Sequence, residues 1–363
     1  NIASIGFSRK WDAREAGQEV AKSAIKNLKS PPSLFLLFST IHYKKNGGFQ
    51  EFLNGIWDIL PDNTPLIGGT IASFINNYGC FSRGATALAI SYPKMDVTIG
   101  IGKHTKIIPR KTGRYCANVI KNGLKKSQYK NKIMINLISS PTVPKIPFIG
   151  RGNNIKSKFF GWIASTVGIR IFPLLGHGLG KEDVLIDEMS KVLKEYYVIG
   201  GSSVDDGKYF NNYQFINKSV YTNSVVALGI STDLPVFLES ILGVHETNKS
   251  FTVTESMYED RIIKKINNKP AKEQFLNILG VNEAQFDNLE VFYSKTANYF
   301  PITFKENKEY TTGTAGFFGN NIALGYKLRG KEAQILSITG NEILEAIDKI
   351  FFKTDNKLTF ALM

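Results

Sequence analysis

The chain has 363 residues, of which 43% are hydrophobic and 21% charged, and its formal net charge at pH 7 is +14. Its length predicts about two or three domains, and its composition is typical of a soluble globular protein. Two cysteines without a CxxC motif exclude a disulfide framework and fit a reducing cytosol. Because no uncharged apolar run reaches about 18 residues, we expect no transmembrane span and a cytoplasmic location.

The positive charge is concentrated in one segment. Residues 97–181 contain sixteen Lys and Arg and no acidic residue, so the remainder of the chain has a net charge of −2. A nucleic-acid site needs basic residues together with a recognition module or stacking aromatics, and we find no such module. We therefore expect no specific nucleic-acid partner. The segment is either a solvated basic face or a site for a polyanion.

The first part of the chain predicts alternating strands and helices. The opening residues, NIASIGFS, have the pattern of a strand rather than a secretory signal. A helix is predicted over 12–28, with Asp12 as its cap. Residues 33–40 predict a buried strand, and residues 49–60 a helix that Pro61 ends. Two strands, RGATALAISY and MDVTIGIG, are then expected to pair as a hairpin.

The second part repeats this order. It predicts a strand (132–140), a helix (181–196) and two strands joined by the turn NKS (213–231). The sequence Ile67-Gly68-Gly69-Thr70 aligns with Ile199-Gly200-Gly201-Ser202 at an offset of 132, whereas the preceding strands differ by about 99. The second copy therefore holds about 33 extra residues near 141–181. Such a repeat predicts two similar half-domains packed as one unit.

The extra residues include an apolar stretch, FFGWIASTVGIRIFPLLG (159–176), which is broken only by Arg170. Because it is short and contains several glycines, we expect a buried hairpin or loop rather than a spanning helix. Contact with a membrane surface is the alternative interpretation.

The pattern changes after about residue 236. A hairpin and a helix that begins after Pro270 are expected over 250–280, strands over 316–339 and a helix over 341–351. The fold class is therefore α+β. Residues 1–236 form one unit of two repeated sheet-and-helix halves (about 1–130 and 131–236), for which αββα layering is one arrangement, and residues 237–363 form a smaller α+β domain. The missing initial Met and the unfinished strand KLTFALM suggest a fragment cut at both ends.

The order and spacing of several motifs resemble the FIST sensory domain over essentially the whole chain. Its opening motif is matched by Gly6, Ser8, Asp12, Ala16 and Gly17. Its GGSagDd pattern is matched by Gly200, Gly201, Ser202, Ser203, Asp205 and Asp206, with Val204 in place of a small residue. Later motifs are matched by HGLGKED (177–183), IIKKINNKPAKEQFL (262–276) and YFPITF (299–304). The chain stops just short of the family's FsCxgR-like strand.

The resemblance implies a ligand-binding sensor in signal transduction, with an amino acid or another small polar molecule as its ligand. We see no kinase, methyl-accepting or cyclase segment, so the expected partner is a separate signalling protein such as a histidine kinase or a chemoreceptor. Some FIST proteins bind haem, which makes a haem-based gas sensor one alternative. A ligand-free interaction scaffold that uses the basic face is another.

The two glycine pairs are the candidate ligand site. Glycine lets a ligand or another backbone approach closely, and exposed N–H groups at such turns can hold a carboxylate. Hydroxyl groups add donors, and the two aspartates, which the first copy lacks, could accept from an ammonium group. The candidate residues are Gly68, Gly69, Thr70, Gly200, Gly201, Ser202, Ser203, Asp205 and Asp206. The structural alternative is a packing corner in which the aspartates form Asx turns.

Enzymatic motifs are missing from both turns. Neither has the P-loop, GxGxxG or GxSxG pattern, and no motif links a histidine to Ser202, so we expect no catalytic residues. We expect no cofactor and, for want of clustered ligands, no metal site. If haem binds, His177 in LLGHGLG is the candidate axial ligand.

Overall fold

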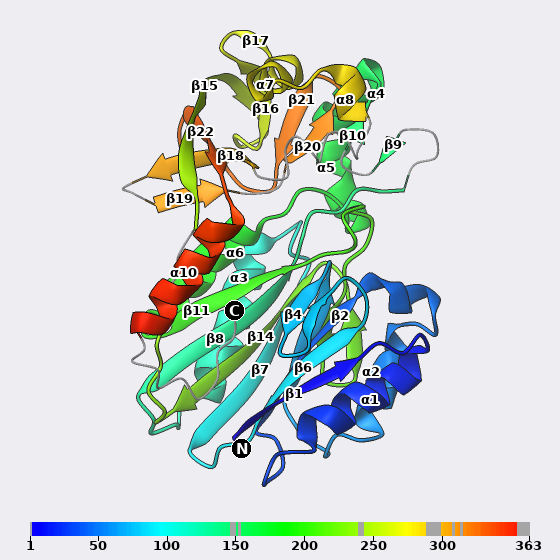
Figure 1. The fold of residues 1–363 in the computed structure, drawn as a ribbon, viewed down its shortest axis with the longest axis vertical. Helices are drawn as coiled ribbons and strands as arrows, with labels where there is room; N and C mark the ends of the chain where they lie inside the picture. The colour runs from blue at the N-terminus through cyan, green and yellow to red at the C-terminus, as the bar shows by residue number, and fades with distance from the viewer. Residues whose placement is uncertain are drawn as a thin grey trace. The chain divides into compact units, whose positions relative to one another are not determined.

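The computed structural model describes residues 2–145, 150–151, 154–238, 243–287, 299–306, 309–312 and 315–353. The chain forms two compact units (Figure 1). The first contains Asn1–Val143 and Pro173–Val236, and the second contains Pro144–Phe172 and Phe237–Met363. Most of the insertion predicted from the repeat therefore belongs to the second unit.

The first unit consists of two halves whose elements follow the same order. The first half contains β1 (Ala3–Ser8), α1 (Ala13–Ile25), β2 (Leu34–Thr40), η1 (Ile41–Lys45), α2 (Phe49–Trp57), β3 (Leu66–Ile71), β4 (Phe74–Asn76), β5 (Gly79–Phe81) and β6 (Ala85–Ile90). The second half contains β7 (Met95–Lys103), α3 (Pro109–Gly123), β8 (Asn131–Ser139), α6 (Glu182–Val192), β11 (Tyr197–Ser203), β12 (Gln214–Ile216), β13 (Ser219–Tyr221) and β14 (Ser224–Thr232).

The sheet topology repeats as well. The first sheet has the order β1-β6-β2-β3, extended by β12 and β13, and the second has the order β7-β14-β8-β11. In each, the third strand pairs in parallel with the fourth and antiparallel with the second. Gly68 lies opposite Leu37, and Gly200 lies opposite Asn136, which reproduces the offsets of 132 and 99. The predicted repeat is thus a repeat of backbone pairing.

One strand prediction was wrong and another was right about its turn but not about the extent of its second strand. Strands β6 and β7 do not form a hairpin, because β6 pairs with β1 and β2 whereas β7 pairs with β14 in the other sheet. The connection between them carries the chain from one half to the next. The turn NKS joins two three-residue strands, β12 and β13, and β14 follows separately. Strand β12 also pairs with β3, so this hairpin extends the sheet of the other half.

The two helices of each half cover one face of its sheet. Side chains of α1 and α2, such as Val20 and Phe52, pack on Phe35 and Leu37 of β2. Likewise, α3 and α6 pack on β8 and β14. The opposite faces of the sheets contact each other, for example through β3 and β14, and bury residues such as Leu36, Ile67 and Leu228. The predicted α+β fold is confirmed, with αββα layering in this unit.

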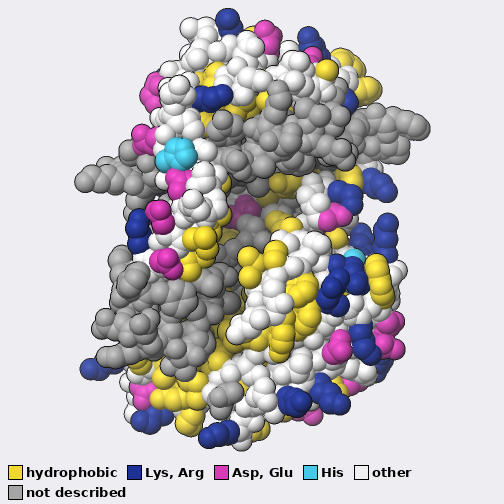
Figure 2. Space-filling model, in the orientation of Figure 1, with side chains coloured by type: hydrophobic (Ala, Val, Ile, Leu, Met, Phe, Trp, Pro, Cys, Tyr) yellow, Lys and Arg dark blue, Asp and Glu magenta, His cyan; other side chains and the backbone are white. Residues whose placement is uncertain are grey.

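The basic segment found in the sequence does not form an uninterrupted basic surface. Arg110 and Arg114 of α3 both pair with Glu188 of α6, at 3.2 and 2.9 Å. Lys132 pairs with Glu195 at 3.4 Å. On the face drawn in Figure 2, Lys and Arg side chains lie interspersed with Asp and Glu.

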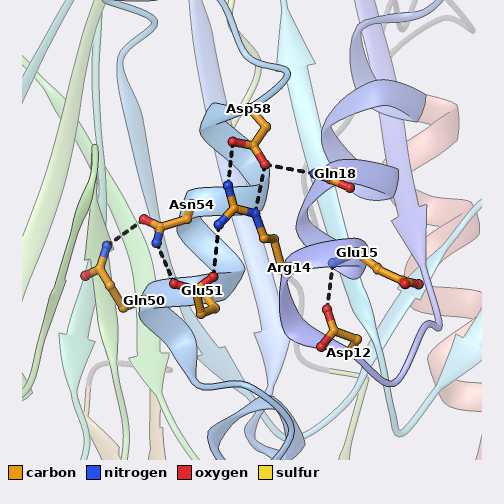
Figure 3. A network of polar contacts seen from close by, with 8 residues as sticks. All are labelled: Asp12, Arg14, Glu15, Gln18, Gln50, Glu51, Asn54 and Asp58. Atoms are coloured by element: carbon orange, nitrogen blue, oxygen red, sulfur yellow. Dashed lines mark hydrogen bonds and ion pairs between the residues drawn. The ribbon is translucent and has the colours of Figure 1, made fainter.

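A polar network fixes α1 against α2 (Figure 3). The predicted cap is confirmed, because the N–H of Glu15 donates to Oδ1 of Asp12 at 3.0 Å. Arg14 donates two hydrogen bonds to Asp58, at 3.1 and 3.0 Å, and one to Glu51 at 3.2 Å. These pairs are exposed and contribute little to stability beside the apolar packing of the two helices.

The second unit is built around one large sheet. Its elements are β9 (Gly150–Arg151), β10 (Asn154–Ile155), α4 (Lys158–Ile163), η2 (Ala164–Gly168), α5 (Ile169–Ile171), β15 (His245–Met257), β16 (Ile262–Ile266), β17 (Lys269–Pro270), α7 (Ala271–Leu279), α8 (Glu283–Asp287), β18 (Tyr299–Glu306), β19 (Glu309–Thr312), β20 (Ala315–Phe318), β21 (Asn321–Leu324), β22 (Glu332–Ser337) and α10 (Gly340–Lys353). The strand order is β19-β18-β22-β15-β16-β21-β20-β10-β9, with β17 on β16. Helix α7 begins after Pro270, as predicted, and packs on the sheet through Phe275.

The prediction for the apolar stretch was wrong. Residues Lys158–Leu175 form a continuous helical segment, which runs from α4 through η2 and α5 to the turn η3 (Phe172–Leu175). By length and composition alone this helix could cross a membrane: its mean hydropathy is 1.2, and 28% of it is buried within the structure. Gly161 and Gly168 lie on its buried side and permit close packing instead of interrupting the helix. The stretch is therefore neither a hairpin nor a mostly buried segment.

Candidate functional site

The first glycine of each pair lets two strands approach closely. A Cβ added to Gly68 would lie 2.1 Å from the carbonyl oxygen of Leu37 in β2. A Cβ added to Gly200 would lie 2.1 Å from the carbonyl oxygen of Asn136 in β8. Because any side chain would collide with backbone atoms, both glycines have the same structural role.

The second glycines have different surroundings. Gly69 lies opposite Gln214 of β12, and a Cβ added to it would lie 2.4 Å from Oγ of Ser203. Gly201 is exposed, and within the described residues an added Cβ would meet no heavy atom inside 4 Å. Strand β11 is therefore accessible at the position where its counterpart β3 is covered.

Thr70 and the end of β11 join the two halves at a buried corner. The N–H of Thr70 donates to the Tyr213 carbonyl at 2.9 Å, and its Oγ1 accepts from the Tyr213 N–H at 3.0 Å. Its carbonyl accepts from the N–H of Val204 at 2.8 Å. The Ser203 carbonyl accepts from the N–H of Ser140 at 3.2 Å. The predicted glycine turns thus meet at one corner of the first unit.

Asp205 organises the loop that follows β11. Its Oδ1 accepts from the N–H groups of Lys208 and Tyr209, at 3.0 and 2.9 Å. Its Oδ2 accepts from the N–H groups of Phe210 and Asn211, at 2.8 and 3.3 Å. The residue is only 5% exposed. These contacts correspond to the structural alternative considered for the aspartates, a side chain that closes its own loop.

Asp206 and Ser202 are both exposed. Asp206 forms an ion pair with Lys208 of the same loop. Ser202 points elsewhere, because its Oγ donates to Oε1 of Glu182 at 3.0 Å. Of the polar residues predicted from the sequence, Ser202 therefore leads to a second group of side chains.

A buried lysine is the basic member of that group. Nζ of Lys106, which follows β7, donates to Oγ1 of Thr142 at 2.6 Å and to the Gly176 carbonyl at 3.5 Å. Burial lowers the pKa of Lys106 to about 7, although the Glu182 carboxyl acts in the opposite direction. Nδ1 of His177 lies 3.2 Å from the same Thr142 oxygen. Burial, and then the charge of Lys106, lower the pKa of His177 below its ordinary value.

Glu182, the first residue of α6, is the acidic member. Burial raises its pKa to about 7, against the effects of its backbone hydrogen bond, Ser202 and Lys106. Its Oε2 is buried and has no hydrogen-bond partner among the described residues. A Cβ added to Gly180 would lie 1.9 Å from this oxygen, so the glycine leaves room for the carboxyl group. A buried acceptor without a partner costs about 1–3 kcal/mol, which a donor placed there would recover.

These five residues, Lys106, Thr142, His177, Glu182 and Ser202, are called the Lys106–Glu182 cluster below. They lie at the carboxyl ends of two parallel strands, β8 and β11. Thr142 follows β8, and Ser202 is the second-last residue of β11. Glu182 begins the helix that connects the two strands. Ligands of α/β sheets bind at this end of parallel strands, because the loops and helix N-termini converge there.

The cluster has the features of neither a metal site nor a haem site. Among the described residues, no three His, Cys, Asp or Glu side chains lie close enough to hold a metal ion. His177, the candidate haem ligand, has Thr142 and Lys106 as neighbours. An axial histidine lies in a largely apolar pocket, so these polar neighbours do not fit a haem.

Comparison with known protein families shows which family the chain belongs to. Residues 33–269, well over half of the sequence, match the FIST N domain. The chain belongs to the FIST family. FIST domains are sensory domains of signal transduction, so the resemblance seen in the sequence is confirmed. The matched range of this FIST protein contains both glycine pairs and the whole Lys106–Glu182 cluster. No curated protein matches the chain.

Three members of the cluster, Lys106, Thr142 and Glu182, were missed in the sequence. Lys106 gives no local signal, because it is one of sixteen basic residues in 97–181. Glu182 did carry a signal, since it belongs to the motif HGLGKED and follows Gly180 by two positions. The loop before α6 therefore pointed to the cluster, but only the spatial neighbours of that loop identify its chemistry.

Proposed function

We propose that this FIST protein is a cytoplasmic sensor whose ligand is a small polar molecule with a protonated amine, such as an amino acid. The ligand binds in the Lys106–Glu182 cluster and is not transformed there. The family provides the sensory role. The ligand class comes from the chemistry of the cluster.

The observation that carries this proposal is the unpartnered oxygen of Glu182. An ammonium group placed at Oε2 would supply the missing hydrogen bond and hold the carboxyl group in its ionised form. A neutral hydroxyl would supply only the hydrogen bond. Because burial of an unpaired carboxylate is costly, the site prefers a cation to a neutral donor.

The neighbours of Glu182 give the ligand a route and a second contact. Ser202 and Gly201 are exposed and lie at the accessible edge of β11. Lys106 has three donors, two of which go to Thr142 and Gly176, so the third serves a ligand carboxylate. An α-amino acid carries both groups and matches both charges.

The response passes to another protein in this proposal. Because FIST domains act in signal transduction, a histidine kinase or a chemoreceptor is the proposed partner. Co-purification with and without ligand tests this step separately from ligand binding.

A thermal-shift screen of amino acids and their deaminated analogues tests the ligand class. A ligand that binds the folded state at 100 times its Kd stabilises it by about 2.7 kcal/mol, which is readily measured. We expect shifts from amino acids, none from the analogues, and none in Glu182→Gln. The matched control is Glu195→Gln, whose side chain is exposed and pairs with Lys132, and which should respond like the wild type.

Other outcomes would contradict the proposal. Equal shifts from amino acids and deaminated analogues would show that no ammonium group is recognised. A Soret band that disappears in His177→Ala would favour the haem alternative. Salt-sensitive co-purification of an acidic protein, with no shift from any small molecule, would favour the scaffold alternative.

A further inference from the structure

The helical segment that begins with α4 turns large apolar side chains outward. Phe159 is 66% exposed, Trp162 is 56% exposed and Val167 is 48% exposed. Phe160 and Ile171 are exposed as well. These five residues, all within the second unit, form what is called the aromatic face below. A helix of a soluble protein normally turns such residues toward the core of the protein, whereas this helix turns them toward solvent.

The opposite side of the helix is small and firmly packed. Gly161, Ala164, Ser165 and Gly168 are buried. A Cβ on Gly161 would lie 2.1 Å from the backbone nitrogen of Gly319, and Oγ of Ser165 accepts from Nδ2 of Asn321 at 2.9 Å. These contacts fix the rotation of the helix within its unit. The outward position of the aromatic face is therefore built into the packing.

The charged residues that flank the aromatic face in the sequence are all basic. Lys156, Lys158 and Arg170 are exposed beside it, and no acidic residue occurs in 97–181. Basic residues next to exposed Trp and Phe are the composition of helices that lie in the interface of an anionic bilayer. A partner protein with an apolar groove would not require this charge.

From these observations we infer that the aromatic face binds the surface of an anionic lipid bilayer. The helix lies in the interface and does not cross the bilayer, because its small side chains are occupied by β20, β21 and the turn between them. The apolar side chains enter the boundary between headgroups and acyl chains, and the basic side chains contact lipid phosphates. The aromatic face belongs to the second unit, whereas the Lys106–Glu182 cluster belongs to the first.

Co-sedimentation with vesicles tests the inference. We expect the full chain to bind phosphatidylcholine vesicles that contain phosphatidylglycerol, and to bind pure phosphatidylcholine vesicles far less. Trp162→Glu should weaken binding by about tenfold or more, because it buries a charge in place of an aromatic ring. Lys158→Gln should weaken it by about fivefold, and high salt should have the same effect.

The control is Leu344→Glu in α10, which adds the same charge at another exposed apolar position, 61% exposed, and should bind like the wild type. Circular dichroism confirms that each variant is folded, and Val167→Glu replaces Trp162→Glu if that variant is not. Absence of vesicle binding, or equal loss in the two glutamate variants, would overturn the inference. A dimer in light scattering that Trp162→Glu dissociates, without vesicle binding, would assign the aromatic face to contact between copies.

Discussion

Burial brings the pKa values of Lys106 and Glu182 to about 7 from opposite directions. Each group is held in a place where its charged form is poorly solvated, and each partly offsets the other. Perturbed pairs of this kind occur at functional sites more often than elsewhere. At the residue scale, this pair distinguishes the second half of the repeat from the first.

The pair predicts a stability minimum near neutral pH. Between about pH 4.5 and 7, Glu182 keeps its proton in the folded state but loses it on unfolding, so the free energy of unfolding falls as pH rises. Between about pH 7 and 10.5, Lys106 is deprotonated only when folded, so the free energy rises again. Urea unfolding across this range measures both limbs. Glu182→Gln should abolish the falling limb, and an unchanged falling limb would assign it to other groups.

Asp205 provides a contrast, because its four N–H contacts give it a structural role. We expect Asp205→Ala to lower the free energy of unfolding by about 2–3 kcal/mol, since buried N–H groups lose a charged acceptor. Asp206→Ala, at an exposed position, should change it by less than about 0.5 kcal/mol. Chemical denaturation compares the two. Similar small effects for both would return Asp205 to the ligand-binding interpretation made from the sequence.

At the scale of elements, the repeat explains why the first glycine of each pair has the same surroundings. Both lie opposite the central strand of a sheet, where a Cβ would meet a carbonyl oxygen at 2.1 Å. The second glycines differ because β12 covers β3, whereas β11 has no strand on its outer side within the described residues.

The two adjacent glycines of β11 therefore make a matched test. Gly200→Ala should destabilise the protein by about 1–3 kcal/mol or more, because the backbone of β8 cannot move away without breaking its pairing. Gly201→Ala should be tolerated, since its Cβ enters open space. Thermal melting of both variants measures the difference. Tolerance at Gly200 would show that the two strands can separate locally.

Local pattern predicted most elements but not their pairing. The helices after Asp12 and Pro270 and the buried strands β2 and β8 follow from caps and apolar periodicity. The assignment of β6 and β7 to different sheets does not, because a short polar connection fits a hairpin and a crossover equally well. The helix that begins with α4 was missed for a related reason: Gly161 packs against the turn at Gly319, which lies far away in sequence.

At the scale of the whole molecule, the basic segment is divided between two environments. In α3, Arg110 and Arg114 share the single carboxylate of Glu188 with Lys191, a contact that no linear pattern showed. Beside the aromatic face, Lys158 and Arg170 are exposed. The number of basic residues can be read from the sequence, but whether each one is solvated, paired or available to a surface depends on its tertiary neighbours.

The central claim, recognition of an ammonium group by Glu182, is tested most directly by calorimetric titration near pH 6 and pH 8. The titrant is the decarboxylated amine of the amino acid with the largest thermal shift, because Lys106, whose pKa is also about 7, loses its charge over the same pH range and would weaken the binding of a carboxylate. A carboxyl with a pKa of about 7 is mostly protonated at the lower pH and mostly ionised at the higher. We predict that affinity rises by about tenfold between them and that Glu182→Gln removes both the affinity and its pH dependence. Equal affinity at the two pH values, or unchanged binding by Glu182→Gln, would contradict the account.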